Sequence, residues 1–132
     1  MHLASLRIIT DDIKRLVQFF EKATGMPPKW YTEDFAELAT SSFTLAIGST
    51  RTMEQFGKGI ATPVSNKSAI IEFRVTNVDE EYEKIKALTS DIVQKPTTMP
   101  WGNRSLLFRD PDGNLINFFT PVSPEAKKKF GI

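Results

Sequence analysis

The side chains best suited to binding chemistry in this sequence are aromatic rings and guanidinium groups beside short apolar runs. Trp101 lies between Pro100 and Gly102, and Arg104 follows closely. An indole beside a glycine can present its flat face to a planar ligand, and a guanidinium can stack on a ring or donate hydrogen bonds. By this reasoning the expected ligand contacts are Trp30, Phe35, Trp101 and Phe119 for stacking, with Arg7, Arg74 and Arg104 as cations. An alternative stays open for Trp30 and Trp101, which can instead pack at contacts between modules or subunits.

The groups available for acid–base or nucleophilic catalysis are few. The chain has no cysteine and one histidine, His2, which is expected to be solvated rather than a metal ligand. It has no nucleophile elbow and no glycine-rich phosphate loop. Glu72 is therefore the one candidate general base, provided that it is desolvated. The alternative for Glu72 is an ion pair with Arg7 or Arg74, which are expected on the same side of the sheet.

Composition narrows the class of protein. The chain has 132 residues, 40% of them hydrophobic and 25% charged, with a formal net charge of +1. These values indicate a globular domain without the excess of positive charge that is typical of a nucleic-acid-binding protein. The absence of cysteine excludes disulfides and fits a cytoplasmic location. No apolar run approaches the length of a membrane span, so no membrane partner is expected.

Two similar series of elements must position these side chains. In the first half, apolar residues recur at helical spacing before Gly25, with Thr10 or Asp11 as the expected N-cap. In the second half, Asn77 or Asp79 is the expected cap of another helix. The predicted elements are strands over 3–9, 30–31, 35–39, 43–47, 69–75, 92–94, 105–108 and 115–119, and helices over 11–24 and 78–89. The order β-α-β-β-β thus occurs twice, which predicts an α+β fold.

The remaining segments connect or follow these modules. We expect module one over 1–48, a connecting loop over 49–68, module two over 69–121 and a tail over 122–132, all within a single domain. The loop is expected both to link the modules and to cover a cleft. Ser123 and Pro124 are expected to open a short helix in the tail, whose three consecutive lysines are expected to face solvent.

Two phrases carry a resemblance to a known family. One is the helix end FFEKATGM from Phe19 to Met26, and the other is the hairpin turn DPDGN from Asp110 to Asn114. Together, in this order, they resemble the glyoxalase/bleomycin resistance/extradiol dioxygenase superfamily, also called the vicinal oxygen chelate superfamily. The resemblance covers 3–121. It implies two βαβββ modules that form a U-shaped mixed sheet around a cleft.

The resemblance also implies where a metal site would lie. Enzymes of that superfamily usually hold a divalent metal through His, Glu or Gln on the first and last strands of each module. Those positions fall on Ser5, Ala46, Ile70 and Asn117 in this sequence. A hydroxyl, two alkyl groups and one amide are a poor set, because catalytic metal sites need three strong protein ligands. We therefore expect no metal and no cofactor, and keep Asn117 as a ligand contact.

The metal-free members of the superfamily suggest a function. Those of the bleomycin-resistance type are dimers that hold a flat drug between aromatic residues, and the phrases around Phe35 and Trp101 are similar to theirs. The expected function is metal-independent binding of a planar aromatic antibiotic or metabolite by a homodimer. A net charge near zero disfavours a cationic drug such as bleomycin. Two alternatives remain: a lyase, isomerase or dioxygenase with a non-standard site, and an interaction protein whose cleft is filled.

Overall fold

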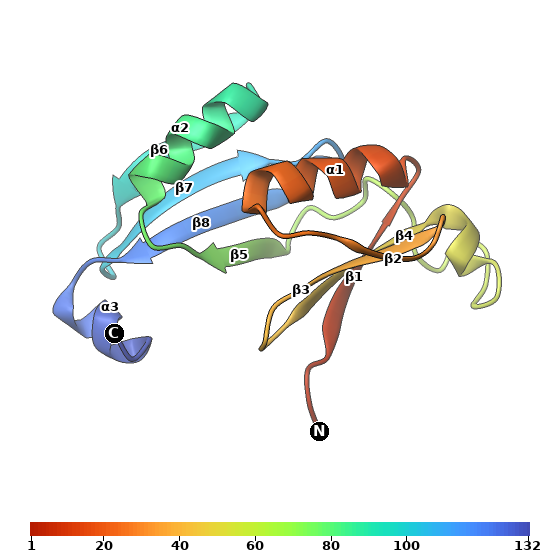
Figure 1. The fold of residues 1–132 in the computed structure, drawn as a ribbon, viewed down its shortest axis with the longest axis horizontal. Helices are drawn as coiled ribbons and strands as arrows, with labels where there is room; N and C mark the ends of the chain where they lie inside the picture. The colour runs from red at the N-terminus through yellow and green to blue at the C-terminus, as the bar shows by residue number, and fades with distance from the viewer. The chain divides into compact units, whose positions relative to one another are not determined.

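The computed structural model describes residues 1–132, and the chain divides into two compact units, Met1–Asn66 and Lys67–Ile132 (Figure 1). Each unit contains a four-stranded mixed sheet and one long α-helix. The predicted α+β class and the repeated β-α-β-β-β order are confirmed. None of the helices has the length and apolar character that would let it cross a lipid bilayer.

The first unit is built on the strand order β1-β4-β3-β2. β1 runs parallel to β4, and the other neighbours are antiparallel. Its elements are β1 (Ser5–Thr10), α1 (Ile13–Thr24), β2 (Lys29–Thr32), β3 (Phe35–Ala39), β4 (Thr44–Ser49) and the 3₁₀ helix η1 (Thr50–Met53). The sequence pattern missed η1, which is a single short turn in the connecting loop.

Helix α1 forms because its apolar residues recur on one face. The residues predicted to form this stripe are all buried, and Phe19 joins them; the predicted set is Ile13, Leu16, Val17, Phe20 and Ala23. The N-cap is Asp12, whose side chain accepts from the N–H of Arg15 at 3.2 Å, so the prediction of Thr10 or Asp11 was wrong. Thr10 instead belongs to β1, and its hydroxyl accepts from the N–H of Asp12 at 3.2 Å. Gly25 ends the helix in the left-handed region, as predicted.

The second unit repeats this plan with the strand order β5-β8-β7-β6, in which β5 is parallel to β8. Its elements are β5 (Ile70–Arg74), α2 (Val78–Leu88), β6 (Ile92–Thr98), β7 (Asn103–Arg109), β8 (Leu115–Pro121) and α3 (Pro124–Lys129). β6 is longer than the predicted 92–94 and includes Pro96. Proline was tolerated there because β6 is an edge strand with one partner, β7.

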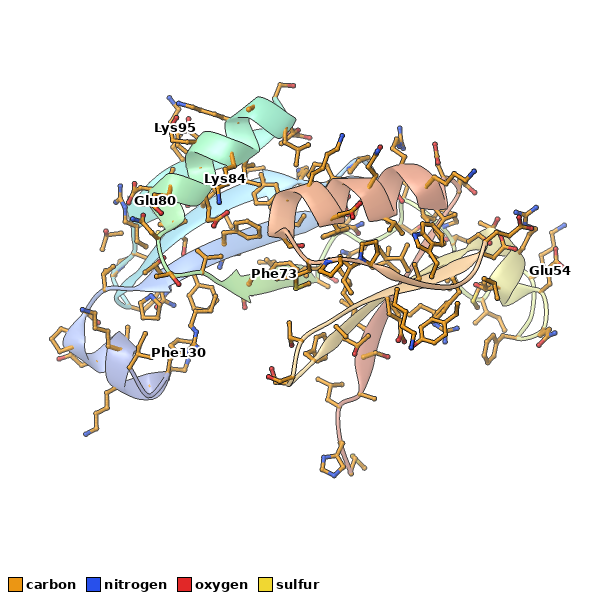
Figure 2. All side chains as sticks on the ribbon, viewed as in Figure 1. Glu54, Phe73, Glu80, Lys84, Lys95 and Phe130 are labelled. Atoms are coloured by element: carbon orange, nitrogen blue, oxygen red, sulfur yellow. The ribbon has the colours of Figure 1, made fainter.

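Helix α2 covers one face of the second sheet. Asn77 is its N-cap and accepts from the N–H groups of Asp79 and Glu80 at 3.1 and 3.2 Å. Val78 and Ile85 are buried, whereas Glu80 and Lys84, which are labelled in Figure 2, are exposed. The helix therefore leaves the opposite face of this sheet to be covered by something else.

The tail after β8 folds back onto that opposite face. Ser123 caps α3 by accepting from the N–H of Ala126 at 3.0 Å, as predicted. The ring of Phe130 lies 5.4 Å from that of Phe119 on β8. Phe119 is buried as a result, although the strand register places it on the face away from α2.

The hairpin turn between β7 and β8 is organised by one buried carboxylate. Oδ1 of Asp110 accepts from the N–H groups of Asp112 and Asn114, both at 2.9 Å, and Oδ2 accepts from Nδ2 of Asn114 at 2.7 Å. Gly113 adopts a φ of 82° and donates to the C=O of Asp110 at 2.9 Å. Burial raises the pKa of the Asp110 carboxyl, against these hydrogen bonds, which favour its ionised form.

Replacing this carboxylate by an amide is expected to destabilise the turn. Asp110→Asn brings an NH₂ group to face Nδ2 of Asn114 and should lower the free energy of unfolding by about 1–2 kcal/mol at pH 7. Because the pKa of Asp110 is raised in the folded state, the folded chain binds more protons than the unfolded chain at pH values between the ordinary pKa and the raised one. The stability that Asp110 contributes is therefore fullest at low pH and falls as pH rises through that window.

Urea unfolding of wild type and Asp110→Asn at pH 4 and pH 7 measures both effects. The stability difference between the two proteins should be larger at pH 4. A difference that shrinks on acidification would show that the hydrogen bonds outweigh burial and hold the pKa down.

Candidate functional site

The first unit has one sheet face that its helix does not cover. The buried partners Leu45, Leu38, Ile47 and Ala36 share the face packed by α1. The strand register places Arg7, Ala46, Glu37 and Lys29 side by side in one row on the other face. We call this second face, together with Phe35, the open face of the first unit. Ala46, which is buried, separates the cation of Arg7 from the anion of Glu37 in this row.

Two phenylalanine rings flank Arg7 on the open face. Its guanidinium carbon lies 5.0 Å from the ring centroid of Phe35 and 5.9 Å from that of Phe56. Phe35 is half-buried on β3, whereas Phe56 comes from the connecting loop and is 66% exposed. Both distances are within the range of cation–π attraction, about 6 Å. The result is a planar cation held beside an aromatic ring that remains open to solvent.

A further aromatic side chain extends this cluster along β2. Tyr31 is 53% exposed, its ring lies 5.9 Å from that of Phe35, and Nζ of Lys29 lies 4.8 Å from its centroid. Trp30 is between these two residues in sequence and pairs with Ala36, so it lies on the opposite face. The structure thus brings together the predicted Arg7 and Phe35 and places the predicted Trp30 away from them.

The loop that carries Phe56 is anchored by Asp34. Oδ1 of Asp34 accepts from Oγ of Ser49 at 2.7 Å and from Nε of Arg51 at 3.0 Å. The Ser49 hydrogen bond and then the Arg51 guanidinium lower the pKa of Asp34, so the carboxylate stays ionised at neutral pH. This ties η1 to the start of β3. Phe56 follows in a turn in which its N–H donates to the C=O of Met53 at 3.1 Å.

The second unit has its own open face, opposite α2, where the register pairs Glu72 with Asn117. Nδ2 of Asn117 donates to Oε2 of Glu72 at 2.8 Å, while Oδ1 of Asn117 is buried without a hydrogen-bond partner. The expected alternative was an ion pair between Glu72 and Arg7 or Arg74. In the structure the hydrogen-bond partner of Glu72 is Asn117 instead. Arg74 instead donates from Nη1 to the C=O of Phe130 at 3.1 Å.

The other predicted contacts of the second unit are separated from this pair. Arg104 forms a two-pronged ion pair with Asp79, both N···O distances being 2.9 Å, which raises the pKa of Arg104 and lowers that of Asp79. Phe119 is covered by the tail. Trp101 is 64% exposed in the turn between β6 and β7.

The sequence reasoning missed Phe56, Tyr31 and Glu37 as members of the first unit's open face. Tyr31 and Glu37 carry a signal, because alternation along β2 and β3 places them on the side of Lys29 and Phe35. Phe56 lies in an irregular loop without periodicity, so nothing in its neighbourhood predicted its position over Arg7.

Comparison with known proteins identifies the family. The sequence pattern of the Glyoxalase/Bleomycin resistance protein/Dioxygenase superfamily matches residues 2–118. The chain belongs to this superfamily. It is 26% identical over 126 residues to the protein named "Uncharacterized protein YraH" of Bacillus subtilis (strain 168), covering 90% of this chain and 98% of that one.

Solved structures of the superfamily share the fold. One is a glyoxalase/bleomycin resistance protein/dioxygenase family enzyme from Burkholderia phytofirmans PsJN, 17% identical, with a TM-score of 0.78 over 92% of this chain and 100% of that one. Another, a glyoxalase/bleomycin resistance protein/dioxygenase from Nocardioides, is 19% identical, with a TM-score of 0.76 over 94% of this chain and 85% of that one. Identities this low support the architecture alone.

The superfamily's usual metal positions do not fit a metal ion in this chain. Ser5 and Ala46 offer one hydroxyl in the first unit, and Ile70 and Asn117 offer one amide oxygen in the second. No three His, Asp or Glu side chains gather in a group that could hold a metal. The unpaired Oδ1 of Asn117 is a single weak donor, and three strong ligands are the norm for a catalytic site. Metal independence stays a prediction that rests on this donor set.

Proposed function

We propose that this superfamily member binds a planar, largely apolar small molecule without a metal ion, and that the open face of the first unit is its binding surface. The observation that carries this proposal is the guanidinium of Arg7 flanked by Phe35 and Phe56, with Phe56 mostly exposed. A flat ring can insert beside Phe56 and stack on aromatic and guanidinium planes together. A planar antibiotic or aromatic metabolite has the matching shape.

The charges on the open face suggest how such a ligand is oriented. Arg7 and Lys29 stand at the two ends of a row that contains one carboxylate, Glu37. An acidic substituent on the ligand is therefore favoured near Arg7, where no carboxylate is directly beside the guanidinium in the strand register. A cationic ligand such as bleomycin is disfavoured, in agreement with the net charge of +1.

Anilinonaphthalene sulfonate, a fluorescent planar anion, tests this proposal. Loss of the Phe56 ring should weaken its binding about fivefold, because a stacked ring contributes about 1 kcal/mol beyond burial and 1.4 kcal/mol corresponds to a factor of ten. The measurement is a fluorescence titration of wild type and Phe56→Ala. Phe43→Ala is the matched control, since Phe43 is an exposed phenylalanine of the same unit outside the open face. Equal affinity for wild type and Phe56→Ala would instead favour an interaction protein with a filled face.

We also propose that the protein acts as a homodimer, with the cytoplasm as its expected location. β1 and β5 are edge strands of their sheets and carry exposed apolar side chains, Leu6 at 39% and Ile70 at 49%. Unpaired strand edges with apolar residues favour association with another chain. Light scattering at micromolar concentration should give twice the chain mass of 14.9 kDa. A mass equal to that of one chain would contradict the dimer.

A further inference from the structure

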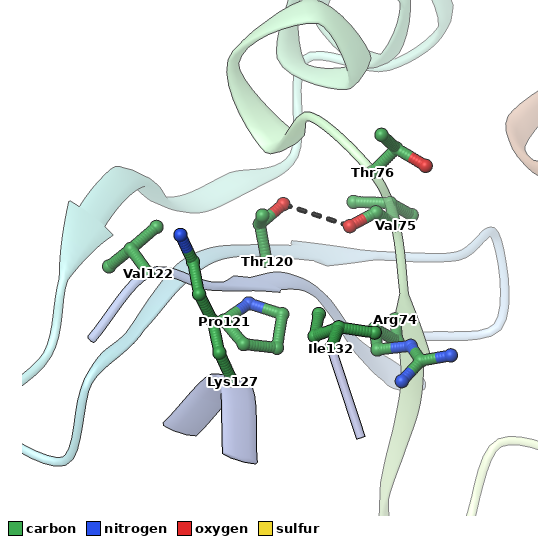
Figure 3. A pocket seen from close by; sticks show the side chains of 8 residues that line it. All are labelled: Arg74, Val75, Thr76, Thr120, Pro121, Val122, Lys127 and Ile132. Atoms are coloured by element: carbon green, nitrogen blue, oxygen red, sulfur yellow. Dashed lines mark hydrogen bonds between the residues drawn. The ribbon is translucent and has the colours of Figure 1, made fainter. Parts of the chain in front are cut away.

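A hollow of about 550 Å³ lies in the second unit, where β5 and β8 end and α3 folds back beside them (Figure 3). Its volume is typical of small-molecule sites, which span roughly 300–1,000 Å³. All of its lining residues belong to the second unit, so it is a different surface from the open face of the first unit. It is therefore a second candidate binding site.

The walls of the hollow are fixed by specific contacts. Oγ1 of Thr120 donates to the C=O of Val75 and accepts from the N–H of Val78, both at 3.0 Å, which joins the ends of β5 and β8 to the start of α2. On the other side, Arg74 donates to the C=O of Phe130 at 3.1 Å and holds the tail. Walls that are already ordered lose little entropy when a ligand binds.

The charged side chains that line the hollow are both cationic. Arg74 and Lys127 lie on different sides of it in Figure 3, and no aspartate or glutamate side chain joins them. A carboxylate at Ile132 would offset one of these two positive charges, and one net positive charge would remain at the hollow. Lys127 is exposed and forms no ion pair, and its ammonium group points toward Thr120 and Val122 (Figure 3). A positive hollow with a free ammonium group attracts an anion.

The remaining lining consists of two threonines and four apolar residues. The side chains of Val75, Pro121, Val122 and Ile132 contribute to the walls between the two cations. An inorganic anion would leave this surface in contact with water, whereas a molecule with an aliphatic part would cover it. The lining thus matches a molecule with one anionic end and a short apolar body.

We propose that this hollow binds a small amphiphilic organic anion, with its carboxylate on the ammonium group of Lys127 and its aliphatic chain against Val75, Pro121 and Val122. The hydrogen bond between an ammonium and a carboxylate is charge-assisted and therefore among the stronger polar contacts. This site does not depend on the ligand proposed for the first unit.

Octanoate is the probe, titrated into the full-length protein and followed by amide NMR spectra. Binding should shift the amide signals of Val75, Thr76 and Val122. Lys127→Gln, which keeps most of the aliphatic stem and removes the charge, should weaken octanoate about tenfold. Lys128→Gln is the matched control and should leave affinity unchanged, because Lys128 is exposed on the same helix but does not line the hollow. The neutral analogue octanol should bind at least tenfold more weakly than octanoate.

Three results would overturn the proposal: no saturable binding of octanoate, equal affinity for wild type and Lys127→Gln, or shifts confined to the first unit. Lys127→Gln should leave the affinity for anilinonaphthalene sulfonate unchanged. That readout separates failure at this hollow from failure of the function proposed for the open face.

Discussion

Alanine at position 102 is expected to lower the free energy of unfolding by about 3 kcal/mol and to release α3 from the second unit. Gly102 has a φ of 96°, in the left-handed region, where a side chain costs about 1 kcal/mol. A Cβ built on Gly102 would overlap Oγ of Ser123 and lie 2.7 Å from Cβ of Ser123 and 3.1 Å from Cβ of Ala126. Overpacking of this kind typically costs a further 1–3 kcal/mol.

The strain falls on the tail because Gly102 also anchors it. Its C=O accepts from the N–H groups of Val122 and Ser123 at 2.9 and 3.1 Å. Relief of the overlap requires the start of α3 to move away, which breaks these bonds and exposes Phe119. Thermal unfolding should show the loss of stability, and hydrogen exchange should show faster exchange of the α3 amides.

Gly113→Ala is the control for Gly102→Ala. Gly113 has a φ of 82° but nothing within 4 Å of an added Cβ, so only the backbone cost of about 1 kcal/mol applies. If the two variants have the same free energy of unfolding and the α3 amides exchange slowly in both, then the close approach of Gly102 to the tail does not destabilise Gly102→Ala.

The sequence predicted those parts of the fold that depend on local patterns. The repeat of apolar residues along α1 and the stop at Gly25 were correct because periodicity and a left-handed cap are encoded within a few residues. β3 was predicted with its observed bounds, Phe35–Ala39. The extension of β6 through Pro96 was missed, because whether proline is tolerated depends on the strand being at an edge, a tertiary property.

Long-range contacts explain what could not be predicted of the site. Arg7 and Phe35 were both predicted as ligand contacts from their side-chain types, and the structure brings them together. Arg74 and Arg104 were expected to serve a ligand, yet the structure uses them to hold the tail and the start of α2. Their partners, Phe130 and Asp79, are distant in sequence, so no local pattern identified them.

Trp101→Ala is expected to weaken binding of a planar ligand to the second unit roughly ten- to a thousandfold, because its exposed indole is a stacking surface of its own, separate from the open face of the first unit. Stacking contributes about 1 kcal/mol beyond burial, and burial of the ring contributes about 2–3 kcal/mol. In the structure, Trp101 is 64% exposed and its ring contacts no other ring. The side chain therefore has little packing to lose, and the melting temperature should stay within a degree or two of wild type.

Affinity and stability, measured on the same variant, separate the two roles of Trp101. The ligand is a planar compound recovered from the native protein by mass spectrometry, or anilinonaphthalene sulfonate if none is recovered. Phe43→Ala again serves as the control for loss of an exposed aromatic ring. A sharp fall in melting temperature with unchanged affinity would make Trp101 a packing residue of an assembly contact. Binding would then rest on Arg7, Phe35 and Phe56, and the likeness to antibiotic-binding members of the superfamily would lose its main support.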